Sequence, residues 1–425
     1  MAVKDIFTGL KGSPKNKETG KNTLCVLPWI HLFIIPSGKV LQCCNTSDFY
    51  SYAGDLNKQS TMEIWNGRFM RAIRKKMMNG QEPEVCSRCY ENERICGTSY
   101  RIINNNNNPD KIEEIPNITK KDGSVEKMDL RFWDFRFSNI CNYKCRICSH
   151  ELSSAWIPDA KALGRLDKDT PNKPTVITSI DNKPNIDFIR EHIGTVKVIN
   201  FVGGEPLLTD EHWQILEMLD KANRDDVYIS YNTNLSLLKY NNKNVLDYWS
   251  KWGKRVLVMA SIDEIDKRAE LIRSGTNWKN VEANLKSINE IGVRILFYMT
   301  VSAMNVFRIP EVFERMTDIG ILRNEKKDGQ NFEINILTQP SYLHVSILPD
   351  VMRRETIVKL QKFINDYEQK YNVSLKEHFH YLFWHLEKPW NEKECRAFKA
   401  FTASMDNLRN ENTLETFPEL RCILE

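Results

Sequence analysis

The feature that most constrains the fold is a regular alternation of strand and helix patterns between residues 128 and 337. Short apolar runs rich in β-branched and aromatic residues predict strands, and the amphipathic stretches between most of them predict helices. The predicted strands are residues 128–137, 196–201, 227–231, 256–261, 294–301 and 332–337, with helices such as 210–222 and 278–291. This alternation predicts an α/β fold with a parallel sheet, closed or partly closed into a barrel, whose ligands gather at the carboxyl ends of the strands.

Length and composition limit what such a chain can be. Because 425 residues exceed what one hydrophobic core usually holds, we expect a large domain and a smaller one. A net charge of +4 from 60 basic and 56 acidic residues gives no strong field for nucleic acid. No apolar run approaches the length needed to cross a bilayer, and residues 1–22 lack the apolar core of a signal peptide. We therefore expect a cytoplasmic protein with neither a membrane nor a nucleic acid as partner.

Three cysteines follow the first predicted strand within eight residues: Cys141, Cys145 and Cys148, at C-x3-C-x2-C spacing. In a cytoplasmic protein, cysteines are more typical of metal ligands than of disulfides. A closed structural zinc site or an electron-transfer [4Fe-4S] cluster needs four protein ligands, whereas three leave one iron open. The loop therefore indicates an open cluster, although a zinc site with a distant fourth ligand also fits the spacing.

A glycine-rich turn follows the second predicted strand. It reads Gly203-Gly204-Glu205-Pro206. The two glycines allow the backbone to approach a ligand closely, while exposed carbonyls and the Glu205 carboxylate can accept hydrogen bonds from an ammonium group. The turn therefore predicts a binding site at this strand end.

The cysteine loop, together with the GGEP turn about 55 residues beyond it, resembles the signature of the radical S-adenosylmethionine (SAM) superfamily. In that superfamily three cysteines hold a [4Fe-4S] cluster, SAM chelates the open iron, and reductive cleavage of SAM gives a 5'-deoxyadenosyl radical that abstracts hydrogen from a substrate. The resemblance implies a partial (β/α)6 TIM-like barrel, SAM as a cofactor, and a reductase such as flavodoxin or ferredoxin as the electron donor.

The resemblance also implies which residues hold SAM. The GGE residues match the motif that binds the amino group of SAM, and Arg273 resembles an arginine that pairs with its carboxylate, which a guanidinium can contact through two parallel hydrogen bonds. Ile147 stands where the family usually has an aromatic residue, so an adenine contact there would be apolar or through the backbone. The full implied set is Gly203, Gly204, Glu205, Pro206, Asn232, Ser261, Asp263, Arg273, Tyr143 and Ile147.

A second group of cysteines lies nearer the N-terminus, where two apolar runs around a Pro-Ser-Gly turn at 36–38 predict a hairpin. The group consists of Cys25, Cys43, Cys86 and Cys89. A zinc ribbon is compatible with this spacing. The pattern also resembles the twitch and SPASM auxiliary-cluster modules of radical SAM enzymes, here preceding the barrel. The resemblance implies a second [4Fe-4S] cluster that relays electrons, with Cys44 as the alternative to Cys43.

Four parts are expected along the chain. They are an auxiliary-cluster domain of α+β type over 1–103, a linker over 104–127, the barrel over 128–340 and a helical extension over 341–425. The linker prediction depends on five consecutive asparagines, 104–108, within a polar stretch. Helices are expected over 61–79, 351–371 and 395–409, and the aromatic residues between the last two are expected to pack on the barrel flank.

The two groups of cysteines together suggest a reaction. Hydrogen abstraction followed by electron transfer to a second cluster is a net two-electron oxidation. We expect an enzyme that oxidises or otherwise modifies a peptide or protein, as many relatives with such modules do. The alternatives are a dehydrogenase of a small sugar or cyclitol and, outside catalysis, a zinc-stabilised binding protein.

Overall fold

The computed structural model describes residues 23–322 and 331–425, which fold into two compact units. The first unit contains the described residues up to Ser138 together with 175–230, and the second contains 139–174 and 231–425. Strand β9 (Tyr228–Thr233) begins in the first unit and ends in the second. The polar leader, residues 1–22, lies outside the described residues.

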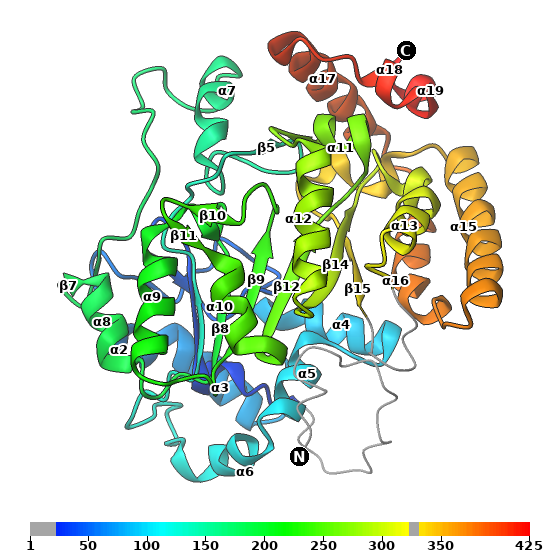
Figure 1. Ribbon diagram of the computed structural model, residues 1–425. Helices are drawn as coiled ribbons and strands as arrows, with labels where there is room; N and C mark the ends of the chain where they lie inside the picture. The colour runs from blue at the N-terminus through cyan, green and yellow to red at the C-terminus, as the bar shows by residue number, and fades with distance from the viewer. Residues whose placement is uncertain (1–22, 323–330) are drawn as a thin grey trace. The chain divides into compact units, whose positions relative to one another are not determined.

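The first unit is built on a mixed sheet, of which β8 is labelled in Figure 1. In spatial order its strands are β3 (Gly54–Asp55), β2 (Lys39–Leu41), β1 (His31–Ile34), β4 (Phe132–Phe135) and β8 (Val198–Phe201). The β1–β2 pair is the predicted hairpin, and Gly38 in its turn has φ +80°. Strand β1 runs parallel to β4, and β4 runs parallel to β8. The N-terminal segment therefore extends the same sheet that begins the predicted barrel.

The helix expected over 61–79 is interrupted. It forms α2 (Thr61–Trp65) and α3 (Arg68–Met78), separated by Gly67. Ser60 starts α2 with a capping box, because its side chain accepts from the Glu63 N–H while the Glu63 carboxylate accepts from the Ser60 N–H.

The expectation that residues 104–127 form an unstructured linker is wrong. Helices α5 (Tyr100–Asn107) and α6 (Pro109–Ile118) occupy much of this segment. Asn105 is the physical reason, since its amide donates to the Leu24 carbonyl at 2.7 Å and accepts from the Val26 N–H at 2.8 Å. Asn105 is thus held by residues far away in sequence, whereas Asn104 and Asn108 donate to carbonyls four residues earlier.

The second unit contains three parallel strands in the order β12 (Val256–Ser261), β14 (Arg294–Val301) and β15 (Phe332–Ile336). One face of these strands is apolar and covered by helices. Phe313 of α13 (Ile309–Asp318) lies over it, with ring centroids 5.7 Å from Phe297 and 5.1 Å from Phe332. The strand periodicity of two places the alternate residues on the opposite face.

The C-terminal extension is helical, as expected. It contains α15 (Asp350–Tyr371), α16 (Lys376–Leu386) and α17 (Glu392–Arg409). Phe379 of α16 is buried, and its ring centroid lies 6.0 Å from that of Phe313. Phe379 therefore packs on the flank of these strands, whereas Trp384 and Trp390 of the same aromatic group are exposed.

Helices connect the parallel strands throughout (Figure 1). They are α8 (Asn185–His192), α9 (Asp210–Lys221), α10 (Val245–Trp252), α11 (Asp266–Ile272) and α12 (Trp278–Glu290). This arrangement confirms the α/β class and is consistent with a partial barrel. Within the described ranges, no helix combines the length and apolar character needed to span a bilayer.

Candidate cluster and cofactor sites

The loop that carries Cys141, Cys145 and Cys148 is anchored by a two-residue ladder. Strand β5 (Lys144–Cys145) pairs antiparallel with β13 (Arg273–Ser274), and Cys145 lies opposite Arg273. The Arg146 N–H donates to the Ile272 carbonyl at 2.7 Å and continues the same contact. The ladder fixes the middle cysteine of the loop beside a guanidinium group.

The three thiols of this loop lie close enough for their charges to interact. Burial raises the pKa of the Cys148 thiol to about 12, and the charges of Cys145 and Cys141 act in the same direction. Burial also raises the pKa of Cys145, while the charge of Arg273 opposes that rise. Coordination to iron removes the thiol protons, so this donor set suits a positively charged cluster with three protein ligands. Over residues 23–322 and 331–425, no three Cys, His, Asp or Glu side chains are arranged to hold a single metal ion.

Asp263 and Arg273 form a buried ion pair beside the loop. Asp263 follows β12 and is 1% exposed. Its Oδ2 accepts from Arg273 Nε at 2.8 Å, and its Oδ1 accepts from the Thr300 N–H at 2.9 Å. Arg273 Nη1 lies 4.0 Å from Cys145 Sγ. Both carboxylate oxygens of Asp263 are therefore engaged within the protein, and the side chain positions Arg273 toward the cysteine loop.

The GGEP turn lies in the first unit, directly after β8. Gly203 has φ +135°, and a Cβ at this position would lie 2.9 Å from the Ser138 carbonyl oxygen. Only glycine fits such a close approach of two backbone segments. Glu205 is buried and accepts from the Leu207 N–H through Oε1 at 3.3 Å, while Pro206 begins a short 3-10 turn. The conformation of the turn is thus fixed by backbone contacts.

The remaining predicted SAM residues lie in the second unit. Ser261 ends β12 and is half-buried, and Asn232 lies in β9 and is also half-buried. Tyr143 is 2% exposed, and a Cβ on Gly275 would lie 3.0 Å from its ring. Ile147 is half-buried on the same loop. Tyr143 therefore packs against backbone.

Two groups near these residues were not assigned from the sequence. Asn234, two residues beyond Asn232, donates to Asn142 Oδ1 at 3.0 Å and places its amide 3.9 Å from Cys141 Sγ. Tyr298 and Glu333 lie in register with Ser261, on the sheet face opposite Phe313. The alternation of apolar and polar residues in β15 is a sequence signal for Glu333.

The second cysteine group lies in the first unit, and its thiols also interact. Burial and the charge of Cys89 raise the pKa of Cys86 to about 12. Cys25 is affected in the same direction by burial, Cys89 and Cys86, and the pKa of Cys43 is raised by its hydrogen bond with Cys44, by burial and by Cys89 and Cys25. Cys44 thus lies directly beside Cys43. All four predicted ligands therefore share one location.

Hydrogen-bond donors converge on the sulfur atoms of this second group. The Asn45 N–H donates to Cys43 Sγ at 3.1 Å, and the Asn45 side chain donates to Cys89 Sγ at 3.2 Å. Donors to sulfur stabilise anionic thiolates and clusters bound to them. This pattern suits a metal cluster.

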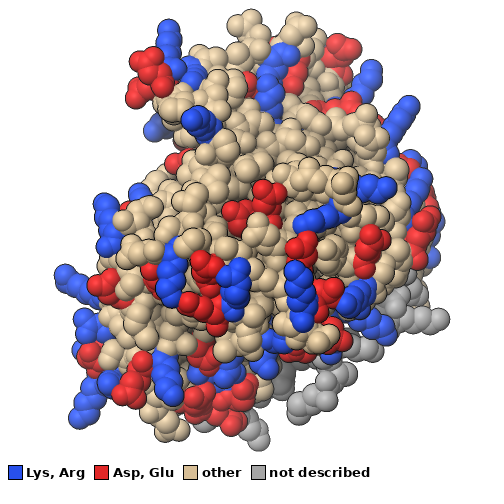
Figure 2. Space-filling model, turned by 60° about the vertical axis from the view of Figure 1, so that its left-hand side comes forward, with Lys and Arg blue, Asp and Glu red and all other residues tan. Residues whose placement is uncertain are grey.

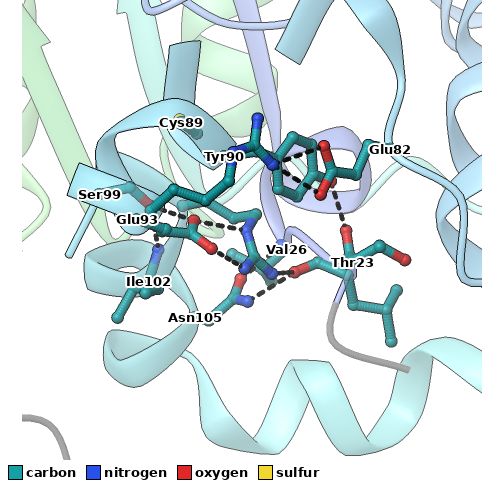
Figure 3. Close-up of polar contacts among 12 residues, drawn as sticks. Thr23, Val26, Glu82, Cys89, Tyr90, Glu93, Ser99, Ile102 and Asn105 are labelled. Atoms are coloured by element: carbon teal, nitrogen blue, oxygen red, sulfur yellow. Dashed lines mark hydrogen bonds and ion pairs between the residues drawn. The ribbon is translucent and has the colours of Figure 1, made fainter. Parts of the chain in front are cut away.

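A buried arginine, Arg101, completes the second site, and its partners Tyr90 and Glu93 are labelled in Figure 3. Arg101 is 4% exposed, its guanidinium lies 5.0 Å from the centre of the Tyr90 ring, and its charge opposes the rise in pKa of nearby Cys25 and Cys86. Its Nε donates to Glu93 Oε1 at 2.9 Å, its Nη2 to Glu93 Oε2, and its Nη1 to the Leu24 carbonyl at 2.7 Å. The ion pair supplies a compensated positive charge next to the four thiols.

The face of the molecule drawn in Figure 2 carries charged side chains of both signs. Basic and acidic side chains are interspersed there. This mixture agrees with the small net charge of +4.

Comparisons with known proteins agree with both sites. Residues 135–316 match the model of the radical SAM superfamily, and residues 25–90 match SPASM, an iron-sulfur cluster-binding domain. No curated protein sequence matches the chain.

Solved structures give distant likenesses. One is native anSMEcpe with bound AdoMet, at 18% identity and a TM-score of 0.38, covering 56% of this chain and 61% of that chain. Another is Streptococcus suis SuiB bound to S-adenosylmethionine, at 15% identity and a TM-score of 0.39, covering 70% of this chain and 63% of that one. This chain thus spans less than two thirds of the length of either protein.

The family matches decide the cofactors. A radical SAM domain uses SAM and a [4Fe-4S] cluster, and a SPASM domain binds additional iron-sulfur clusters. The cofactors predicted from the sequence are therefore confirmed. Residues 135–316 of this chain match the radical SAM superfamily model, and the preceding residues 25–90 match the SPASM iron-sulfur cluster-binding domain.

Proposed function

We propose that this protein is a radical SAM enzyme that oxidises or otherwise modifies a peptide or protein substrate. When bound, the [4Fe-4S] cluster and SAM supply a 5'-deoxyadenosyl radical at the expense of one electron from a reductase such as flavodoxin or ferredoxin. Removal of one hydrogen atom from the substrate, then of one electron to the auxiliary cluster and one proton to solvent, completes a two-electron oxidation. A peptide is favoured because relatives with such modules commonly modify peptides.

The observation that carries this proposal is the group formed by the three thiols and Arg273. Arg273 approaches Cys145 Sγ to 4.0 Å and is oriented through Nε by Asp263. A carboxylate bound at the open iron would meet a guanidinium that is already held in place. We therefore assign Arg273 to the carboxylate of SAM and Asp263 to the positioning of Arg273.

The resemblance to the radical SAM superfamily supports the roles proposed for the other predicted SAM residues. Glu205 and the backbone of Gly203 and Gly204 bind the amino group of SAM, and Pro206 holds their turn. The adenosine half is contacted by Asn232, Ser261, Tyr143 and Ile147. Each group of residues matches hydrogen-bonding or apolar parts of SAM.

The polar sheet face next to Ser261 suits the substrate. Tyr298 and Glu333 lie in register with Ser261, and the Glu333 side chain is exposed. Surrounding protein nevertheless raises the pKa of Glu333 to about 7. An accessible carboxyl group with restricted hydration suits a hydrogen-bond donor of the substrate, such as an amide or hydroxyl group.

Anaerobic reconstitution tests the enzyme class. We expect the wild-type protein to bind twice the iron of one [4Fe-4S] cluster and to form 5'-deoxyadenosine from SAM in the presence of dithionite. The triple variant Cys141→Ala, Cys145→Ala, Cys148→Ala should keep half the iron and form no 5'-deoxyadenosine. Cys395→Ala, which changes a buried cysteine of α17, is the matched control. Colourless protein with stoichiometric zinc would instead identify a zinc-stabilised binding protein.

The substrate class is tested by mass spectrometry after incubation of the reduced enzyme with SAM and candidate peptides or cyclitols. We expect a peptide to lose the mass of two hydrogen atoms or to gain a crosslink. Oxidation confined to a sugar or cyclitol would replace the peptide proposal with a small-molecule dehydrogenase.

A further inference from the structure

The end of the C-terminal extension contacts the cysteine loop through a buried arginine. Arg146, between Cys145 and Cys148, is 0% exposed. Its Nη2 donates to Asp406 Oδ1 at 2.5 Å and to Glu411 Oε2 at 2.6 Å. In the part of the chain that the structure describes, Arg146 Nε and Nη1 have no hydrogen-bond partner. The two carboxylates therefore provide the neutralising contacts of this buried cation.

A second arginine makes the complementary connection. Arg409, the last residue of α17 (Figure 1), donates through Nε to Asp159 Oδ2 at 2.8 Å and through Nη1 to Ser274 Oγ at 2.8 Å. Ser274 Oγ donates in turn to Glu411 Oε1 at 2.8 Å. Because Ser274 belongs to β13, these bonds connect the C-terminal segment to the ladder that holds Cys145.

Apolar packing supports the same contact. Phe401 and Met405 of α17 form a buried cluster with Trp156, and Cys148 packs against it. The Trp156 indole N–H donates to the Cys145 carbonyl at 2.7 Å. Two of the three predicted cluster ligands are therefore adjacent to side chains that depend on α17.

We propose that residues 401–411, here called the C-terminal brace, position the ligand loop of the radical cluster and set the charge around it. The brace contributes two carboxylates and one guanidinium, and each of them is paired with a group on or next to the loop. Breaking one member of a buried ion pair leaves an uncompensated charge, which is strongly unfavourable. The inference rests on the proposed function in that it places a cluster on Cys141, Cys145 and Cys148.

Hydrogen exchange of the metal-free protein tests the positioning role. In Glu411→Gln we expect the amides of residues 143–153 to exchange about tenfold faster than in wild type, because one charge-assisted hydrogen bond to the loop is lost. Glu392→Gln is the control, since Glu392 forms an exposed pair with Arg396 on the same helix. Exchange at α15 monitors whether the variant is folded. Unchanged exchange at 143–153 would overturn the positioning role, whether or not a cluster binds.

The midpoint potential of the reconstituted cluster, measured by redox titration with EPR detection, tests the electrostatic role. Removing a negative charge in Glu411→Gln should raise the potential, and removing a positive charge in Arg146→Gln should lower it. The double variant should return toward the wild-type value. A loosened loop alone would move both single variants in the same direction, and that result would overturn the electrostatic role.

If the Arg146 variant does not fold, a variant of a second positively charged residue, Arg409, provides the same test. Arg409→Gln removes a positive charge from the same segment and should also lower the potential. If wild-type protein holds no cluster on the three cysteines, the proposed function fails, and hydrogen exchange alone then decides the positioning role.

Discussion

Arg273 lies between a carboxylate that orients it and a thiol that it approaches. Burying this guanidinium costs free energy, which Asp263 offsets through a short charge-assisted hydrogen bond. Because Asp263 also accepts from the Thr300 N–H, its own position is fixed by the neighbouring strand. The direction of Arg273 is therefore determined by backbone structure rather than by a ligand.

Replacing Asp263 should weaken SAM binding without removing any proposed SAM contact. In Asp263→Asn we expect affinity for SAM, measured by anaerobic equilibrium dialysis of the reconstituted enzyme, to fall roughly 10- to 100-fold, as for loss of one charge-assisted hydrogen bond. Asp266→Asn, a change at an exposed neighbour, should leave the affinity unchanged. Equal losses in the two variants would contradict the positioning role.

Among the helices and strands, the sequence pattern correctly predicts those whose conformation depends mainly on neighbouring residues. The strands expected at 256–261 and 294–301 have those same bounds in the structure, since each is a long apolar run. The helices at 100–118 could not be predicted, because the Asn105 side chain bonds to backbone at Leu24 and Val26, about 80 positions away. The two-residue strands β5 and β13, which fix Cys145, are too short to leave a pattern.

Asn105 bonds to the backbone on both sides of Cys25, at the Leu24 carbonyl and the Val26 N–H. In Asn105→Ala we expect the unfolding free energy of the metal-free protein to fall by about 1 to 3 kcal/mol, since the buried Val26 N–H loses the Asn105 oxygen and the Leu24 carbonyl keeps its bond from Arg101 but loses the one from Asn105. Auxiliary iron should also be lost faster to a chelator, which absorbance can follow. Asn106→Ala, at an exposed position of the same helix, should behave like wild type in both measurements.

Glu264 follows strand β12, and ionisation of its carboxyl group opposes folding. Burial raises the pKa of Glu264 to about 7, against the partial opposition of Arg268, and within the described residues Oε1 has no hydrogen-bond partner. The folded protein holds this proton more tightly than the unfolded chain, so the stabilisation is complete below the unfolded pKa and is lost as pH rises toward 7.

Glu264→Gln should remove this pH dependence. Between pH 5 and pH 8 we expect the free energy of unfolding of the variant, relative to wild type, to shift by about 2 kcal/mol in favour of the variant. Urea denaturation of the metal-free proteins at both pH values measures the shift. The same difference at both pH values would show that Glu264 is not protonated in the folded state at pH 5.

At the scale of the molecule, each cysteine group belongs to one unit. Cys25, Cys43, Cys86 and Cys89 lie in the first, and the loop cysteines lie in the second. The sequence motifs identified both groups, since cysteine spacing is local. They did not predict that residues 175–230 belong with the N-terminal part of the chain, because that association depends on pairing of β8 with β4.

The two cysteine groups should therefore be separable by mutation. Replacing Cys25, Cys43, Cys86 and Cys89 with alanine should halve the iron content while 5'-deoxyadenosine formation from SAM and dithionite continues within a few-fold of the wild-type rate. Oxidised product should be lost, since the substrate radical then has no auxiliary cluster to accept its electron. Iron analysis and chromatographic assay of both products provide the measurements.

The parallel pairing of β1 with β4 makes the rest of the sheet dependent on the N-terminal segment. In a protein that began at residue 128, β4 would expose the amide and carbonyl groups that now pair with β1. An unpaired strand edge of this kind promotes aggregation. The segment that matches SPASM, residues 25–90, therefore cannot be removed without exposing the edge of β4. A related protein without this segment would need another strand or helix to cover the edge of β4.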